Sequence, residues 1–241
     1  MVLAAARVAA TVAVLAAHSS AGEDPPAAAL WELRGSQATA AYFPSMFRTW
    51  PEFRAYVNAQ AAFGTNQIEM GGAPVCDKSG QLVHTHCVDC TLCEASVAAL
   101  VQFSTELQQL GVNVSFGWSL AIFSEHRVLV EKAFRLMPKV DSVFFPGGDG
   151  GSLVWADVES AAVTLRKYHP DAKVWVSAQE YNETELEGFF QRLSQTATRR
   201  FLSGVVVGPH WRIPTTEIVR RMPAGYLLRQ YPDICHSLQA Q

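Results

Sequence analysis

The sequence predicts an α/β fold, a (β/α)8 TIM-barrel-like domain that is truncated after about seven strands. First, short apolar strand-like runs alternate with amphipathic helical windows, as in strand–helix units around a parallel sheet. Second, most strand-to-strand steps are about 20 to 35 residues, enough for one strand and one packed helix. Third, no G-x-G-x-x-G follows the first strand and no G-x-x-x-x-G-K-[ST] occurs, which disfavours an open nucleotide-binding sheet.

Seven strand candidates follow one another along the chain, at 38–43, 65–70, 112–118, 140–145, 173–177, 203–207 and 226–229. A complete barrel of this type needs eight strands. The sequence ends at Gln241, soon after the seventh candidate. We therefore expect either a natural chain that continues or a split first strand and an incomplete barrel, whose open sheet edges would need a partner.

The windows between the strands have helical periodicity, with apolar residues recurring at i, i+3, i+4 and i+7. Asn182, followed three residues later by Glu185, predicts a capped helix start. Gly111 is a natural helix end, and His169-Pro170 ends another helix. The predicted helices cover 100–110, 130–137, 155–168 and 186–193.

Residues 1–21 have the pattern of a secretory signal peptide, with an apolar run at 8–17 and the small residues Ser19-Ser20-Ala21 at its end. An Ala-rich transit peptide or a wrongly chosen gene start are the alternatives. No later stretch approaches the roughly 18 apolar residues of a membrane-spanning helix. We expect a secreted protein with no membrane contact after cleavage, with a linker at 22–36 and a barrel domain at 37–241.

Composition narrows the range of partners. The chain has 19 Lys and Arg against 22 Asp and Glu, a formal charge of -3, and no basic run, which excludes nucleic acid and anionic membranes as expected partners. With 49% hydrophobic and 17% charged residues, the 241-residue chain can bury a large core. Six Trp suit either stacking on sugar rings or ordinary core packing.

Four of the five cysteines fall within one short segment, and Cys235 lies apart near the end of the sequence. In an oxidising compartment, four local cysteines most simply form two disulfides that pin a long loop. The clustered cysteines are Cys76, Cys87, Cys90 and Cys93. A metal site is one alternative, because neighbouring histidines offer zinc-type ligands, and free thiols are the other. That ligand set would be His84, His86, Cys87 and Cys90.

In a barrel of this type the reacting groups stand on the loops after the carboxyl ends of the strands. Asp149 lies among four glycines in the PGGDGG segment after the fourth strand, where glycine permits positive φ and close approach of a ligand. Glu180 follows the fifth strand. Two carboxylates across one sugar ring are the arrangement that glycoside hydrolysis uses. The alternatives are a plain flexible loop for Asp149 and a solvated helix start for Glu180.

Other strand ends carry side chains suited to binding a sugar, by hydrogen bonds or by stacking. The expected substrate-binding residues are Glu69, Trp118, Tyr181, His210, Trp211, Tyr231 and Asp233. The sequence contains no G-x-S-x-G and no H-E-x-x-H, which argues against a serine esterase and a zincin protease. We expect no cofactor, and no metal in the leading interpretation.

With these segments, the chain resembles diverged TIM-barrel glycoside hydrolases, the broad group of hexosaminidase-like and α-glucuronidase-like barrels. The resemblance rests on the layout of FRAYVNAQAAFGTNQIEM, VDSVFFPGGDGG, HPDAKVWVSAQEY, and GVVVGPHW with LLRQYPDICHS. It implies a carbohydrate substrate. Barrel hexosaminidases that use substrate assistance have two adjacent acids after the fourth strand, whereas this chain has only Asp149 there.

The expected function is therefore a secreted glycoside hydrolase-like protein that uses Asp149 and Glu180 as its acid/base pair. A catalytically inactive carbohydrate-binding barrel, or a truncated gene product, is the first alternative. A metal-dependent hydrolase built on the cysteine and histidine loop is the second.

Overall fold

The computed structural model describes residues 30–31, 38–41, 49–71, 74–83, 90–117, 120–148, 153–208 and 211–230. Its strands are β1 (Leu30–Trp31), β2 (Ala38–Ala41), β3 (Gln67–Gly71), β4 (Val75–Cys76), β5 (Leu82–Val83), β6 (Asn113–Gly117), β7 (Ser142–Phe145), β8 (Lys173–Val176), β9 (Gly204–Val207) and β10 (Leu227–Gln230). Its helices are α1 (Trp50–Ala62), α2 (Glu94–Gln109), α3 (Leu120–Glu125), α4 (Arg127–Leu136), α5 (Trp155–Tyr168), α6 (Glu183–Ser194), α7 (Thr196–Arg199) and α8 (Thr215–Arg221).

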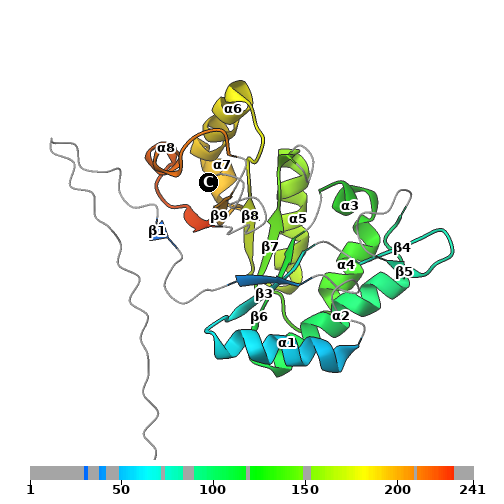
Figure 1. The fold of residues 1–241 in the computed structure, drawn as a ribbon. Helices are drawn as coiled ribbons and strands as arrows, with labels where there is room; N and C mark the ends of the chain where they lie inside the picture. The colour runs from blue at the N-terminus through cyan, green and yellow to red at the C-terminus, as the bar shows by residue number, and fades with distance from the viewer. Residues whose placement is uncertain are drawn as a thin grey trace, which may run out of the picture.

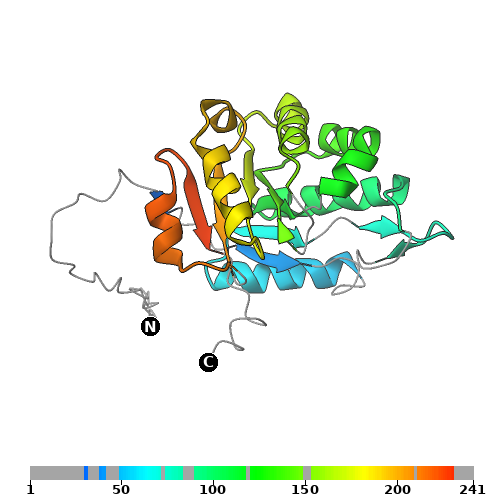
Figure 2. The same cartoon turned by 90° about the horizontal axis from the view of Figure 1, so that it is seen from above.

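Strands and helices alternate around one parallel sheet, so the predicted α/β class is confirmed (Figure 1). The sheet has the order β1-β10-β9-β8-β7-β6-β3-β2, and every neighbouring pair in it is parallel. The helices lie around the outside of the sheet (Figure 2). A separate antiparallel hairpin, β4–β5, lies in the segment where the cysteines cluster.

The seven predicted strands correspond to β2, β3, β6, β7, β8, β9 and β10, and the four predicted helices to α2, α4, α5 and α6. The predicted cap of α6 is present, because Asn182 accepts a hydrogen bond from the backbone of Glu185 and the Glu185 side chain returns one to Asn182. Several elements are additional, among them the helices α3, α7 and α8. β1 lies within the segment expected to be a linker, and the β4–β5 hairpin was expected to be loop.

The two faces of the sheet carry different side chains. The outward side chains, such as Ile68, Val114, Val174 and Val205, belong to the large core beneath the helices. The inward side chains include a small apolar cluster of Phe144, Trp175 and Val206 with Leu227 packed against it. The site described below therefore rests on a sheet that is buried on both faces.

An ion pair between two strands that lie far apart in the sheet order shows that the sheet is strongly curled. Arg229 on β10 and Glu69 on β3 are five strand steps apart in the sheet order. In a flat sheet this would be about 24 Å, at roughly 4.8 Å a step. Their side chains nevertheless meet at 2.9 Å between Nη2 and Oε2. The sheet therefore curls far enough for side chains of β3 and β10 to meet across its concave face.

No helix in the described ranges is long and apolar enough to cross a membrane.

Candidate functional site

The loops that follow β7 and β8 pack directly against each other at the carboxyl edge of the sheet. The backbone N–H of Gly147 donates a 3.1 Å hydrogen bond to the carbonyl oxygen of Ser177. A Cβ on Gly147 or Gly148 would overlap the backbone of the β8 loop, and Gly148 has a φ of 71°. The positive φ expected of these glycines is thus present at Gly148. Their close approach is to the neighbouring loop.

Glu180 stands in that neighbouring loop with an exposed side chain and a φ of 62°. Among the described residues it is the one non-glycine with positive φ. A glutamate in the left-handed region costs on the order of 1–2 kcal/mol, because its Cβ crowds the following carbonyl oxygen. Backbone strain of this kind gathers at functional sites, where the surrounding structure holds it in place.

Tyr181 fixes the chain that follows the glycine-rich segment. Its hydroxyl accepts a 3.0 Å hydrogen bond from the backbone N–H of Leu153. Its ring meets the ring of Phe189 on α6 edge-on, with centroids 6.2 Å apart. Burial raises the pKa of the Tyr181 hydroxyl. The residue is thus a half-buried brace between the β7 loop and α6.

Trp211, in the loop after β9, packs on the same aromatic side chain. Its ring is edge-on to Phe189 with centroids 5.9 Å apart. Its indole nitrogen Nε1 is buried and has no hydrogen-bond partner within the described ranges. Phe189 therefore brings Tyr181 and Trp211, two of the predicted binding residues, to one place between β8, β9 and α6.

Glu69 lies on the concave face of the sheet at the centre of a buried polar network. Its Oε2 atom accepts a 2.9 Å hydrogen bond from the Ser115 hydroxyl and receives the Arg229 guanidinium. Ser142 in turn donates to Ser115 at 2.8 Å, and Gln67 donates to Ser142 at 3.4 Å. The network offsets the cost of burying a carboxylate that is only 4% exposed.

Arg229 is the residue that the sequence analysis did not select. Its side chain is 13% exposed, and while Nη2 pairs with Glu69, the buried Nη1 has no hydrogen-bond partner in the part of the chain that the structure describes. The available signal was a single cation at the end of an apolar strand candidate. Buried cations require a partner, so Arg229 and one interior acid could have been matched on that ground.

Five of the predicted residues lie outside the described residues, so their positions are still predictions. They are Trp118, Asp149, His210, Tyr231 and Asp233.

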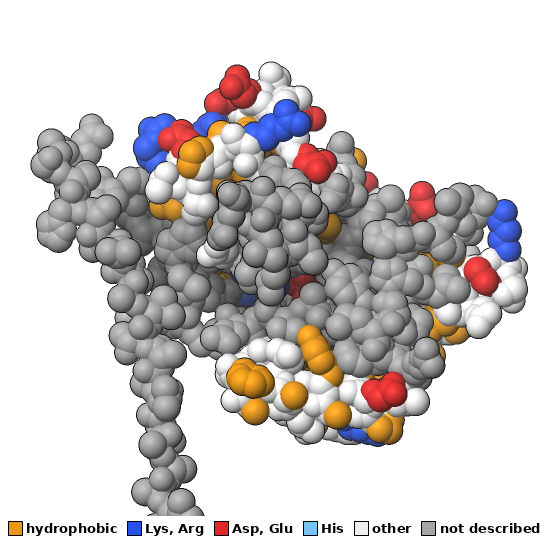
Figure 3. Space-filling model, in the orientation of Figure 1, with side chains coloured by type: hydrophobic (Ala, Val, Ile, Leu, Met, Phe, Trp, Pro, Cys, Tyr) orange, Lys and Arg blue, Asp and Glu red, His pale blue; other side chains and the backbone are white. Residues whose placement is uncertain are grey.

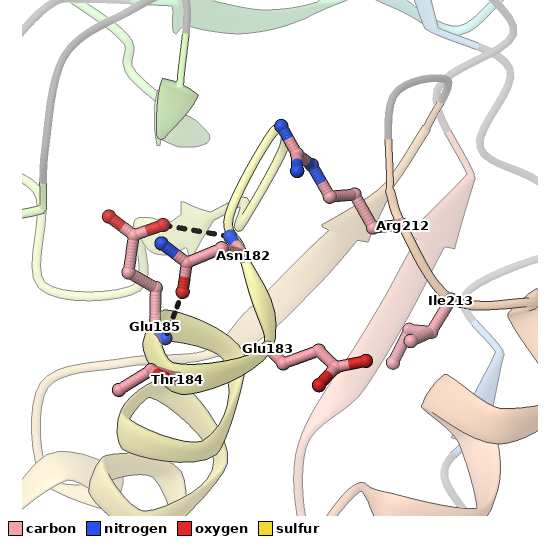
Figure 4. A pocket seen from close by; sticks show the side chains of 6 residues that line it. All are labelled: Asn182, Glu183, Thr184, Glu185, Arg212 and Ile213. Atoms are coloured by element: carbon pink, nitrogen blue, oxygen red, sulfur yellow. Dashed lines mark hydrogen bonds between the residues drawn. The ribbon is translucent and has the colours of Figure 1, made fainter.

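A polar cavity of about 590 Å³ opens beside the β8 loop (Figure 4). One side is the first turn of α6 with Asn182, and the other is the loop after β9. Arg212 and Glu183 bring opposite charges to its rim. Its lining residues are Asn182, Glu183, Thr184, Glu185, Arg212 and Ile213. The cavity adjoins the predicted site, since Glu180 and Tyr181 immediately precede Asn182.

The cysteine loop contains disulfides, as the leading interpretation expected. Cys76 on β4 is bonded to Cys93, the N-cap of α2, with Cα atoms 6.0 Å apart. Cys90 is also disulfide-bonded. A disulfide sulfur is no longer the thiolate that binds zinc. Cys90 is therefore not available as a zinc ligand, and the other three ligands of the alternative metal site, His84, His86 and Cys87, lie outside the described residues.

Comparison with known proteins leaves the chain without an assigned family. No family model matches it. No curated protein matches it. One similar solved structure is an α-L-fucosidase, the AlfC fucosyltransferase mutant, with a TM-score of 0.39 and 8% identity over 76% of each chain. A likeness this distant assigns neither a fold family nor a function.

Proposed function

We propose that this chain is a secreted glycoside hydrolase-like protein of the (β/α) barrel type, with Asp149 and Glu180 as its two reacting carboxylates. The observation that carries the proposal is Glu180, an exposed acid held in a left-handed backbone conformation against the glycine-rich loop to which Asp149 belongs. Backbone strain at the carboxyl end of a strand is typical of a functional site rather than of a solvated helix start. The second acid, Asp149, follows the neighbouring strand β7 in the sequence.

The register of the sheet supports closure into a barrel. Glu69 aligns with Ser115, then Ser142 and then Lys173 across neighbouring strands. Two residues beyond Lys173, Trp175 aligns with Gly204 and hence with Leu227.

Arg229 is two residues beyond Leu227, so it stands four residues ahead of Glu69 along the ladder. The two side chains pair despite this offset of about 13 Å at roughly 3.3 Å a residue. Such a stagger is what barrel closure requires.

In this proposal, one carboxylic acid donates its proton to the glycosidic oxygen as the bond to the anomeric carbon breaks. The other carboxylate either attacks the anomeric carbon or activates a water. Trp211 and Tyr181 wall the sugar on the β8–β9 side. Glu69 and Arg229 form the floor, where a paired acid and base offer an acceptor and a donor to sugar hydroxyls.

Hydrolysis of a panel of aryl glycosides tests the assignment. Asp149→Asn and Glu180→Gln keep side-chain size but remove the carboxylate, and each is expected to lower kcat by about 100-fold or more. Glu159→Gln is the matched control, because Glu159 is an exposed acid on α5 and does not line the cavity. If one acid is a nucleophile, its Ala variant should regain activity with azide. Unchanged turnover in both variants would overturn the assignment.

A catalytically inactive carbohydrate-binding barrel is the second candidate. The interior acid that the structure describes, Glu69, is already neutralised by Arg229 and bonded to Ser115, which suits recognition better than reaction. Saturable binding of a sugar without hydrolysis, lost in Trp211→Ala and kept in Glu180→Gln, would favour this candidate over the enzyme.

A further inference from the structure

Two segments of the sequence have the pattern Asn-x-Ser/Thr, which marks an acceptor for N-linked glycans in exported proteins. One begins at Asn113 and the other at Asn182. The structure places these two asparagines very differently, and neither the fold nor the proposed function uses the pattern.

The Asn113 segment is part of the sheet, as the first residues of β6. Asn113 starts β6, which lies between β3 and β7, and its Oδ1 atom accepts a 3.0 Å hydrogen bond from Lys139. Its third residue, Ser115, is fully buried and donates to Glu69. A glycan on this strand would stand against the packing of Lys139 and β6, so a folded chain does not carry one there.

The Asn182 segment is exposed over all three residues, at the start of α6. Figure 3 shows charged side chains of both signs on the surface over this helical end of the molecule. The Oδ1 atom of Asn182 caps the helix by accepting a 3.0 Å hydrogen bond from the Glu185 backbone. Its Nδ2 atom makes no hydrogen bond with any described residue, and neither does the Thr184 hydroxyl. The cap uses the oxygen, whereas glycosylation uses the nitrogen.

We propose that Asn182 carries an N-linked glycan and that Asn113 does not. The donor is a polyprenyl-diphosphate-linked oligosaccharide of the secretory lumen. The bond between Nδ2 and the sugar C1 forms as the C1–O bond to the diphosphate breaks. Nδ2 loses one proton, and polyprenyl diphosphate leaves. The product is still an amide whose oxygen can accept from Glu185, so the helix cap and the glycan coexist.

The position of the glycan has a consequence for the neighbouring surface. Asn182 lines the 590 Å³ cavity and stands two residues after Glu180. In Figure 4 its side chain lies over the first turn of α6, away from Arg212 and Ile213. The glycan therefore leaves from the outer helix layer, beside the site and not from within the curled sheet. The inference rests on the secretion that is part of the proposed function, and not on the proposed catalytic residues.

The test is the mass of the full chain produced in a secretory eukaryotic host, before and after digestion with peptide N-glycosidase. One form keeps residues 1–21, and a second replaces them with the host's own leader. We expect digestion to remove one glycan and to leave an aspartate at position 182, which peptide mapping in heavy-oxygen water labels. Failure of the first form alone would overturn the proposal for the natural chain and show that Asn182 is an acceptor only behind a supplied leader.

Variants distinguish the loss of the glycan acceptor from the loss of the helix cap. Asn182→Gln removes the acceptor and the cap together, whereas Thr184→Ala removes the acceptor pattern and leaves the cap, so both should lose the whole mass shift. Thr184→Ser, Glu183→Gln and Asn113→Gln should keep it. The glycan is attached before the chain folds. For variants that the cell retains, the mass shift is therefore measured on the chain recovered from the membrane fraction. No shift in the host-leader form, or a shift that survives Thr184→Ala, would overturn the proposal.

Discussion

The ion pair between Glu69 and Arg229 gives the sharpest prediction about how the curl of the sheet is stabilised. Its side chains are 4% and 13% exposed, so removing one partner leaves a buried charge uncompensated. Glu69→Leu and Arg229→Met should therefore each lower the free energy of unfolding by about 3 kcal/mol, the lower end of the range for broken buried pairs. The double variant Glu69→Leu/Arg229→Met buries no charge.

The double variant should cost less than either single change. Its main loss is the hydrogen bond from Ser115, worth about 1 kcal/mol. The coupling energy between the two positions should then exceed about 2 kcal/mol, whereas independent sites add within about 0.5 kcal/mol. Coupling of this size across five strand steps arises only if the sheet brings the two side chains together.

Urea unfolding followed by tryptophan fluorescence measures the cycle, with the m value as a check that each variant still unfolds as one unit. The control is the exposed pair Glu217–Arg220 on α8, whose coupling should be within about 1 kcal/mol. An additive cycle for Glu69 and Arg229 would contradict their contact across the concave face of the sheet.

Three further changes test the loops and the helix layer. Gly148→Ala, which combines positive φ with overlap of the β8 loop, should lower the free energy of unfolding by more than about 2 kcal/mol in chemical denaturation, whereas Gly80→Ala, with similar φ and open space, should cost about 1 kcal/mol. Glu180→Gly should leave that free energy unchanged or raise it by up to about 1 kcal/mol, since relief of strain exceeds the added chain entropy, while glycoside hydrolysis is lost. Burial lowers the pKa of His169, so the neutral form is favoured in the folded state. Stability should therefore fall as the pH drops below about 6.5 and His169 is forced to charge, and His169→Gln should flatten this slope in melts across pH 5 to 7.

The strands and helices were predictable because their signals are local. Apolar runs with breaks marked the seven strands, and periodicity marked α4 and α6. β1 could not be found this way, because a two-residue strand has no periodicity and exists only through its pairing with β10. The β4–β5 hairpin, with two residues in each strand, escaped for the same reason.

The site was predictable only in outline. The rule that function gathers after strand ends led to Glu180, Tyr181 and Trp211, and two of these do meet on Phe189. The pairing of Glu69 with Arg229 depends on the curvature of the whole sheet and on a stagger of four residues, which no local pattern contains. The long-range curvature of the sheet is therefore what the sequence alone could not predict.

The structure also changes which residues indicate a functional site in the loops after β7 and β8. Packing against the backbone of Ser177 and Gln179 explains why Gly147 and Gly148 are glycines, so these two residues are not evidence for a bound ligand. No such packing reason accounts for Glu180: its side chain is exposed, and its backbone takes a conformation that glycine or asparagine would adopt at lower cost. Selection for stability alone would favour those residues there. The strain at Glu180 thus has no explanation in the packing of the described residues, which makes Glu180 the first position to substitute.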